Sequence, residues 1–208
     1  KIYYKLWPEL VKFGVPLMPA AFAVYFMNTA DRWFIQYYHG EYSLGEFSVG
    51  AKFALLITMA VSVFRQAWWP IAMDAMHNDD GPELFRIIGK FYIGISCICL
   101  ILITFFSPWL ILIVGKQYYS SWPIVGILCW QPILYGFFLI ASAGIWKTEK
   151  TYLNLPIMLF SALFGLLLNW ILVPSFGGIG AAIATAISFL IWIIISIIVS
   201  ENLWNISL

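Results

Sequence analysis

The chain has 208 residues, of which 62% are hydrophobic and only 10% charged, and its net charge is +1. Ordinary soluble domains have roughly 45–50% apolar and about 25% charged residues, so this chain has too few charges to cover a water-facing surface. The composition excludes a soluble globular domain, and the near-zero net charge argues against a general nucleic-acid binder.

The predicted elements are helices that cross a membrane. Residues 91–115, 117–146 and 151–200 carry no charge at all. Because a helix needs about 20 mainly apolar residues to cross a bilayer, the last stretch holds two spans and the other two hold one each. With two earlier spans, we expect an all-α membrane protein in which residues 1–208 form a single lobe of six transmembrane helices: 13–38, 44–72, 88–114, 122–146, 152–173 and 180–199.

Basic residues predict the orientation of these spans. Lys116 is the only basic residue in the loops on one side, whereas seven lie on the other if the spans alternate: Lys1, Lys5, Lys12, Arg86, Lys90, Lys147 and Lys150. Positively charged loops remain in the cytoplasm. Both termini of this segment are therefore expected to be cytoplasmic.

Charged side chains within the first two spans are the first candidate site. A charge at bilayer depth costs about 2.5–3.5 kcal/mol on insertion scales, so it usually faces a partner or a wet cavity. Asn28, Asp31 and Arg32 share a helix face by their spacing. Alternatively, Asp31, Arg32 and Lys52 lie near the outer interface, where they pair with one another or extend to water.

Arg65 lies roughly two turns from the cytoplasmic end of the second span, and its spacing places it on a face with Trp68 and Trp69. A guanidinium framed by indoles would suit the phosphate or sugar of an amphiphilic substrate, so we expect Arg65 to point into a hydrated cavity. Reaching the nearby interface is the alternative. Pro16 and Pro19, near the start of the first span, either mark a kink used in gating or only shape packing.

The loop between the second and third spans contains the one candidate for catalysis. Residues 78–83 (NDDGPE) are faintly similar to the acidic magnesium motif of membrane prenyltransferases, but the second acidic cluster that those enzymes need is not found. The pattern of Asp80, Gly81, Pro82 and Glu83 favours a helix start instead. We therefore expect no catalytic residue, no cofactor and no metal site.

The residues of the last two spans predict how these helices turn and pack. Residues 174–178 predict a tight turn, because the combined apolar run is too long for one crossing. Asn169 would be unfavourable in lipid and should hydrogen-bond to another helix or to backbone. The sixth helix has a small-residue face that lets neighbouring backbones approach closely, formed by Ala181, Ala182, Ala184 and Ala186.

Several stretches together resemble a known family. They are residues 13–19 (FGVPLMP), 28–35 (NTADRWFI), 45–52 (GEFSVGAK), 67–70 (AWWP), 168–174 (LNWILVP) and 176–185 (FGGIGAAIAT). In this order they are similar to the polysaccharide-biosynthesis flippases, the O-antigen and capsule translocases of the multidrug/oligosaccharidyl-lipid/polysaccharide exporter superfamily.

The resemblance implies a two-lobed exporter-type fold with about twelve spans around a central cavity. This chain is similar to the second, C-terminal lobe. A single lobe supplies only one wall of the cavity, so the resemblance implies a partner in the bilayer. That partner is either the N-terminal lobe of a longer chain or another lobe in the membrane.

The function implied by the resemblance is flipping of an undecaprenyl-diphosphate-linked oligosaccharide across the bacterial inner membrane, by alternating access, for surface polysaccharide synthesis. The expected roles are positive charge from Arg32, Lys52 and Arg65, sugar stacking by Trp68 and Trp69, and flexing at Pro16 and Pro19. Asn28 and Asp31 complete the expected substrate-binding set.

Two other functions are weighed against this one. The first is an antiporter of the same fold for small drug-like cations, which would favour unpaired carboxylates in the cavity. The only deep carboxylate is Asp31, beside an arginine, which favours anionic cargo. The second is a membrane enzyme that acts on polyprenyl phosphates through Asp79, Asp80 and Glu83.

Overall fold

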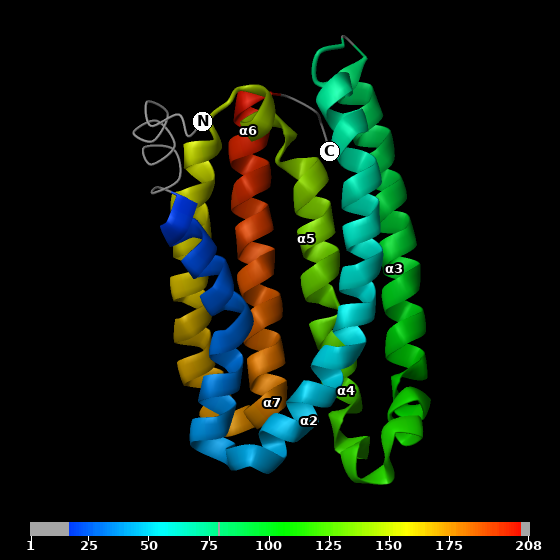
Figure 1. The fold of residues 1–208 in the computed structure, drawn as a ribbon, viewed down its shortest axis with the longest axis vertical. Coiled ribbons are helices and arrows are strands. Elements are labelled where there is room, and N and C mark those ends of the chain that lie inside the picture. Colours follow the sequence, from blue (N-terminus) through cyan, green and yellow to red (C-terminus); the bar gives the residue numbers. More distant parts are fainter. Residues whose placement is uncertain (1–16, 79, 205–208) are drawn as a thin grey trace, which may run out of the picture.

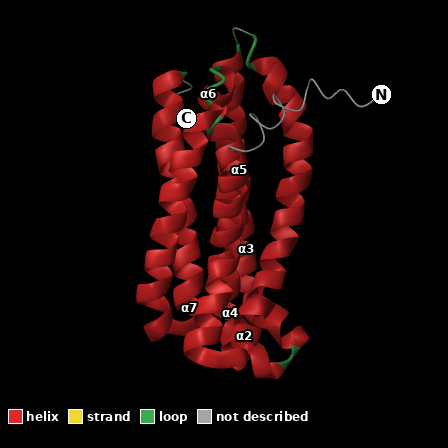
Figure 2. Ribbon diagram, turned by 60° about the vertical axis from the view of Figure 1, so that its left-hand side comes forward, coloured by secondary structure: helices red, strands yellow, loops and turns green. Residues whose placement is uncertain are grey.

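The computed structural model describes residues 17–78 and 80–204, and within them every regular element is a helix. The helices run along one common long axis, and the connecting loops lie at the two ends of the bundle (Figures 1 and 2). In chain order they are α2 (Leu17–Ala75), α3 (Gly81–Val114), η2 (Lys116–Ser121), α4 (Trp122–Leu128), α5 (Trp130–Ala141), α6 (Ala143–Lys147), η3 (Thr151–Leu153) and α7 (Asn154–Leu203).

Two of these helices, α2 and α7, bend sharply at a glycine. Gly40 has φ +75° and Gly177 has φ +55°, and each separates two helical arms. Glycine accepts a positive φ because it has no Cβ atom. At both bends the chain turns back along the bundle (Figure 1). The predicted turn at 174–178 is confirmed, but it is tighter than expected, since Pro174 is still helical and the reversal occurs at Gly177.

The predicted helix start at Asp80 is also confirmed. Asp80 precedes the first residue of α3, Pro82 lies in its first turn, and Glu83 adds an acidic side chain there. Asp80 makes no capping hydrogen bond with its side chain. The helix therefore begins with the fixed φ of proline and a favourable charge near its positive end.

The fourth predicted span, 122–146, is interrupted in the structure. It is divided into α4, α5 and α6, with breaks at Cys129 and Ser142, and a 3-10 turn, η2, precedes it. Pro132 lies one turn after the first break. Because proline has no backbone N–H and crowds the preceding turn, it explains a break at that point.

Within the described residues, four helical segments are long and apolar enough to cross a membrane: Asn28–Ala75, Gly81–Val114, Lys116–Ala141 and Thr151–Leu203. The chain is therefore a multi-pass membrane protein, as its composition predicted. The first and last of these segments contain the bends at Gly40 and Gly177.

The helices pack around two apolar clusters, one toward each end of the bundle. One cluster includes Phe85 and Trp192, and the other includes Ile35 and Val173. The predicted small-residue face of α7 is confirmed by its most buried members, Ala181, Ala182 and Ala184, which are fully inaccessible. Small side chains let α2 approach α7 closely, and this contact positions the polar residues described next.

Candidate functional site

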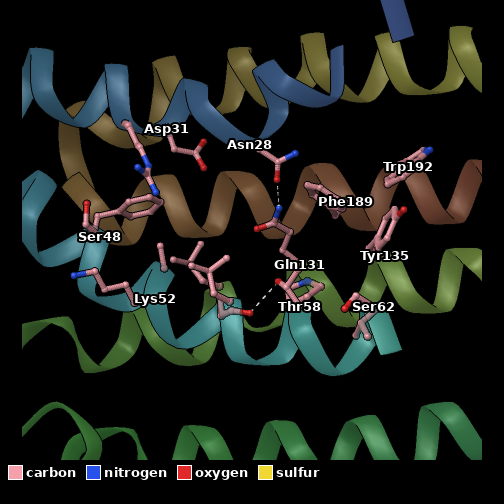
Figure 3. A pocket seen from close by; sticks show the side chains of 18 of the residues that line it. Asn28, Asp31, Ser48, Lys52, Thr58, Ser62, Gln131, Tyr135, Phe189 and Trp192 are labelled. Carbon is pink, nitrogen blue, oxygen red and sulfur yellow. Dashed lines mark hydrogen bonds between the residues drawn. The ribbon is translucent and has the colours of Figure 1, made fainter. Parts of the chain in front are cut away.

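A cavity of about 660 Å³ opens between α2, the α4–α5 segment and the second arm of α7. This volume lies within the range of about 300–1,000 Å³ that is typical of ligand pockets. The accessible surface of its described lining is mostly apolar, but a set of polar or charged side chains extends along its length (Figure 3): Asn28, Asp31, Arg32, Ser48, Lys52, Thr58, Ser62, Arg65, Gln131 and Tyr135.

Three of these lining residues are cationic and accessible: Arg32, Lys52 and Arg65. Arg32 comes from the first arm of α2, and the other two come from the second arm. The bend at Gly40 folds these arms against one cavity, so residues far apart along the helix share its wall. The cavity therefore has a positive lining, which suits an anionic ligand.

Arg65 has a polar partner across the cavity wall. Its Nη1 donates to the hydroxyl oxygen of Tyr135 at 3.4 Å. The ring of Tyr135 lies 6.1 Å from that of Trp192, and Phe189 also lines the cavity. An arginine beside aromatic rings offers contacts to both phosphate and sugar groups.

Asn28 and Gln131 meet across the cavity. The amide of Gln131 donates to Oδ1 of Asn28, which ties α5 to the first arm of α2 (Figure 3). Both side chains carry further donors and acceptors. Such amides bind sugar hydroxyl groups without requiring a charge.

Asp31 is placed differently from the three cations. It is only 4% exposed, and its carboxylate accepts hydrogen bonds from Asn169 Nδ2 at 2.8 Å and from the hydroxyl of Thr185. Asn169 also donates to the carbonyl of Gly165. The prediction that Asn169 bonds to another helix is confirmed. Asp31 joins α2 to both arms of α7, and one side of it borders the cavity.

The two tryptophans predicted to stack on sugar lie elsewhere. Trp68 is 3% exposed and packs between Phe64 and Phe85, and Trp69 contacts Trp146 with ring centroids 5.1 Å apart. Neither lines the cavity. Their helix turns these indoles toward α3 and α6, and the aromatic lining comes instead from Phe47, Tyr135, Phe189 and Trp192.

The structure therefore brings Asn28, Asp31, Arg32, Lys52 and Arg65 together and leaves out Trp68 and Trp69. The two proposed gating prolines are not tested: Pro16 lies outside the described residues, and Pro19 lies in the first turn of α2.

Several lining residues escaped the sequence analysis. Gln131 and Tyr135 lie four residues apart in α5, and Thr58 and Ser62 have the same spacing in α2. Polar residues at helical spacing within apolar runs share a face, so this signal was available. The spacing within each helix did not indicate that the polar faces of α2 and α5 meet.

The acidic loop at residues 78–83 is only partly within the described residues. Among the described residues, no group of three or more His, Cys, Asp or Glu is placed to hold a metal ion. Asp80 and Glu83 lie at the start of α3, and Asp79 is not among the described residues.

The N-terminal part of the chain is similar to a known protein family. Residues 1–76 match the family model of polysaccharide biosynthesis proteins. The predicted resemblance to polysaccharide-biosynthesis proteins is confirmed over these residues. The matched segment contains Asn28, Asp31, Arg32, Lys52 and Arg65, so the charged wall of the cavity belongs to the part of the chain that carries the family pattern. Searches of curated proteins and of solved structures find no match.

Proposed function

We propose that this protein is a flippase that moves a polyprenyl-diphosphate-linked oligosaccharide, of the undecaprenyl type, across the bacterial inner membrane for surface polysaccharide synthesis. The observation that carries the proposal is the convergence of Arg32, Lys52 and Arg65 on one cavity within a multi-pass membrane protein. Charges are retained in a membrane protein where they face a polar path.

The proposal includes six membrane crossings. The 59 residues of α2 would extend about 90 Å as a straight helix, three times the thickness of the hydrocarbon core. The bends at Gly40 and Gly177 divide α2 and α7 into arms that each suit a single crossing. Positive-inside bias would then place the connection that carries Lys147 and Lys150 in the cytoplasm.

Different side chains of the cavity would bind different parts of the substrate. The guanidinium groups of Arg32 and Arg65 form charge-assisted hydrogen bonds with phosphate oxygens. Asn28 and Gln131 offer hydrogen bonds to sugar hydroxyl groups, and Tyr135 offers an aromatic face. The polyprenyl tail stays in lipid. A second lobe would close the open side of the cavity, and rocking of the two lobes would expose it to each face in turn.

The alternative of a cation antiporter is less consistent with this lining. Three accessible cations would repel a cationic drug. The only carboxylate in the described lining, Asp31, is buried and already accepts two hydrogen bonds.

Ligand binding by the purified chain gives a first test. A fluorescent polyprenyl-diphosphate oligosaccharide should bind to the wild type, and Arg65→Gln should weaken binding about tenfold, equivalent to about 1.4 kcal/mol for a lost charge-assisted hydrogen bond. Lys90→Gln is the matched control, because Lys90 is exposed on α3 and lies outside the cavity. Equal affinities for the wild type and Arg65→Gln would contradict the proposal that this cavity binds the substrate.

Leaflet-to-leaflet movement is the decisive measurement. In proteoliposomes that contain the protein and a second lobe, labelled lipid-linked sugar should cross the bilayer without any bond being cleaved. Magnesium-dependent cleavage of the diphosphate, abolished by Asp79→Asn, would favour the polyprenyl-phosphate enzyme instead.

A further inference from the structure

A hydrogen bond between two side-chain amides crosses the large cavity. Nε2 of Gln131, on α5, donates to Oδ1 of Asn28, on the first arm of α2. Figure 3 shows this amide bridge in the middle of the cavity, with Lys52 on one side of it and with Tyr135 and Trp192 on the other. The amide bridge therefore divides the lining of the cavity into two parts.

Cationic side chains lie on both sides of the amide bridge. Arg65 belongs to the side of Tyr135, because its guanidinium donates to the Tyr135 hydroxyl. Arg32 lies on the opposite side with Lys52, since it is one helical turn closer than Asn28 to the bend in α2. One side therefore has two accessible cations, and the other combines a single accessible cation with aromatic rings.

The cations on the two sides are too far apart to hold one diphosphate together. Lys52 and Arg65 lie on the same helical arm, and their positions in the sequence correspond to a separation of about 20 Å along the helix. Side chains of one helix lean in the same direction, toward its N-terminus, so the two charged groups keep most of this separation. A diphosphate is much shorter, because its two phosphorus atoms are joined through one oxygen. It can therefore pair with the cations of only one side at a time.

We propose that the amide bridge is a gate inside this lobe, between two successive binding positions for the diphosphate of the lipid-linked substrate. One position is formed by Arg32 and Lys52, and the other is formed by Arg65 with Tyr135. The inference rests on the proposed flippase function and adds an order of events to it. The diphosphate exchanges one group of cations for the other, and the amide bridge opens between the two steps.

A passing substrate can replace the hydrogen bond that it breaks. When the amide bridge opens, Nε2 of Gln131 can donate to a phosphate oxygen, and Oδ1 of Asn28 can accept from a sugar hydroxyl group. An apolar chain offers no such replacement, so the bridge stays closed against lipid tails. The absence of charge at the gate also suits an anion in transit, because a cation at this point would retain it between the two positions.

Equilibrium dialysis of the purified full chain against radioactive inorganic diphosphate counts the binding positions. We expect two diphosphates per wild-type chain, one per chain for Arg65→Gln, and one for the double variant Arg32→Gln/Lys52→Gln. The control, Lys90→Gln, lies outside the cavity and should retain two.

No bound diphosphate, or a single one that is lost in either variant, would overturn the proposal of two positions. If the lipid-linked sugar still binds in that case, the proposed function stands and only the gate is refuted.

A charge pair in place of the two amides tests the gate itself. In the double variant Asn28→Asp/Gln131→Lys the bridge becomes a stronger, charge-assisted hydrogen bond, while the net charge of the cavity is unchanged. In proteoliposomes that contain a second lobe, this variant should flip labelled lipid-linked sugar at least tenfold more slowly than the wild type. Dialysis should still find two diphosphates per chain. The inverted pair, Asn28→Lys/Gln131→Asp, should behave in the same way, which separates the effect of the bridge from that of either charge.

The matched control is Gln131→Leu, which removes the same amide but cannot lock the bridge, so it should slow flipping less than either charge pair. Flipping at the wild-type rate by both charge pairs would overturn the gate. Equal slowing by Gln131→Leu and the charge pairs would also overturn it, because the loss would then come from missing contacts with the substrate.

Discussion

Helices α2 and α3 both expose much of their surface, but they expose different chemistry. The outward face of α3 is apolar between Phe91 and Trp109 and includes Ile98 and Phe105. The exposed face of α2 includes the cations Arg32, Lys52 and Arg65, all of which line the large cavity. None of the described lining residues comes from α3.

This difference shows that exposure has two meanings in a membrane protein. A side chain on α3 that is exposed in the bundle is solvated by acyl chains, where apolar groups are favoured. A side chain on the cavity face of α2 is accessible to a polar interior, where charge is tolerated. Accessible area does not separate the two cases, whereas the chemistry of the neighbouring side chains does.

The largest expected effect is a difference in stability between two variants, one with an arginine on the outer face of α3 and one with an arginine on the cavity face of α2. Ile98, on α3, is 60% exposed, and Leu55, in the cavity, is 56% exposed. Ile98→Arg should be destabilised by about 2.5–3.5 kcal/mol, because the charge is placed in lipid. Leu55→Arg should be tolerated.

The measurement is the fraction of each variant that is inserted and monodisperse after extraction from membranes. Comparable losses for both variants would mean that the cavity is as apolar as the outer surface, and would break the distinction between the two faces.

A smaller effect is expected from adding one methyl group at a glycine. A Cβ atom on Gly136 would collide with the hydroxyl of Tyr92 and with Val61, and that hydroxyl bonds to the carbonyl of Ile133. Gly136→Ala should therefore destabilise the protein by about 1–3 kcal/mol through overpacking. Gly94→Ala, on the open face of α3, should be nearly neutral, because a Cβ there contacts nothing within 4 Å.

Unfolding in mixed micelles, followed by tryptophan fluorescence, compares the two glycine variants. A large loss for Gly94→Ala would show that this face of α3 is covered by protein rather than by lipid.

The smallest effect concerns the fine structure of the cavity. Tyr135→Phe removes the acceptor of the Arg65 hydrogen bond at 3.4 Å and leaves the ring in place. Since a typical intramolecular hydrogen bond contributes about 0.5–1.5 kcal/mol and this one is long, we expect affinity for the lipid-linked sugar to fall about two- to tenfold. Tyr119→Phe, at an exposed tyrosine outside the cavity, should leave it unchanged.

Affinity is measured by titration of the fluorescent substrate, at low and at physiological salt. An unchanged affinity for Tyr135→Phe would mean that Arg65 reaches the phosphate without help from this hydroxyl.

Much of the fold could be predicted from local properties. Charge-free runs predicted spans, and the helix start at Asp80 and the turn near Gly177 followed from proline and glycine chemistry. The need of Asn169 for a partner followed from the absence of water in a bilayer. The interruption at Cys129 was not predicted, although Pro132 was visible, because proline in a membrane helix is often accommodated by its neighbours.

The candidate site could be predicted only in part. Arg32, Lys52 and Arg65 were singled out because a charge in an apolar run is unusual wherever the helix points. The orientation of Trp68 was not predictable, since an indole suits both a core and a cavity, and packing against Phe85 decided for the core. Gln131 was overlooked because nothing in its own helix shows that it meets Asn28.

The sequence by itself determined the solvent of this protein, its helical secondary structure and the residues that cannot rest in lipid, because these follow from composition and from spacing within one helix. Tertiary structure alone decided which of those residues meet. Asp31 finds its partners Asn169 and Thr185 only because the arms of α2 and α7 fold against each other, across separations of 138 and 154 residues. The reason is physical: helical periodicity orients a side chain relative to its own axis, and only packing of one helix on another orients it relative to the rest.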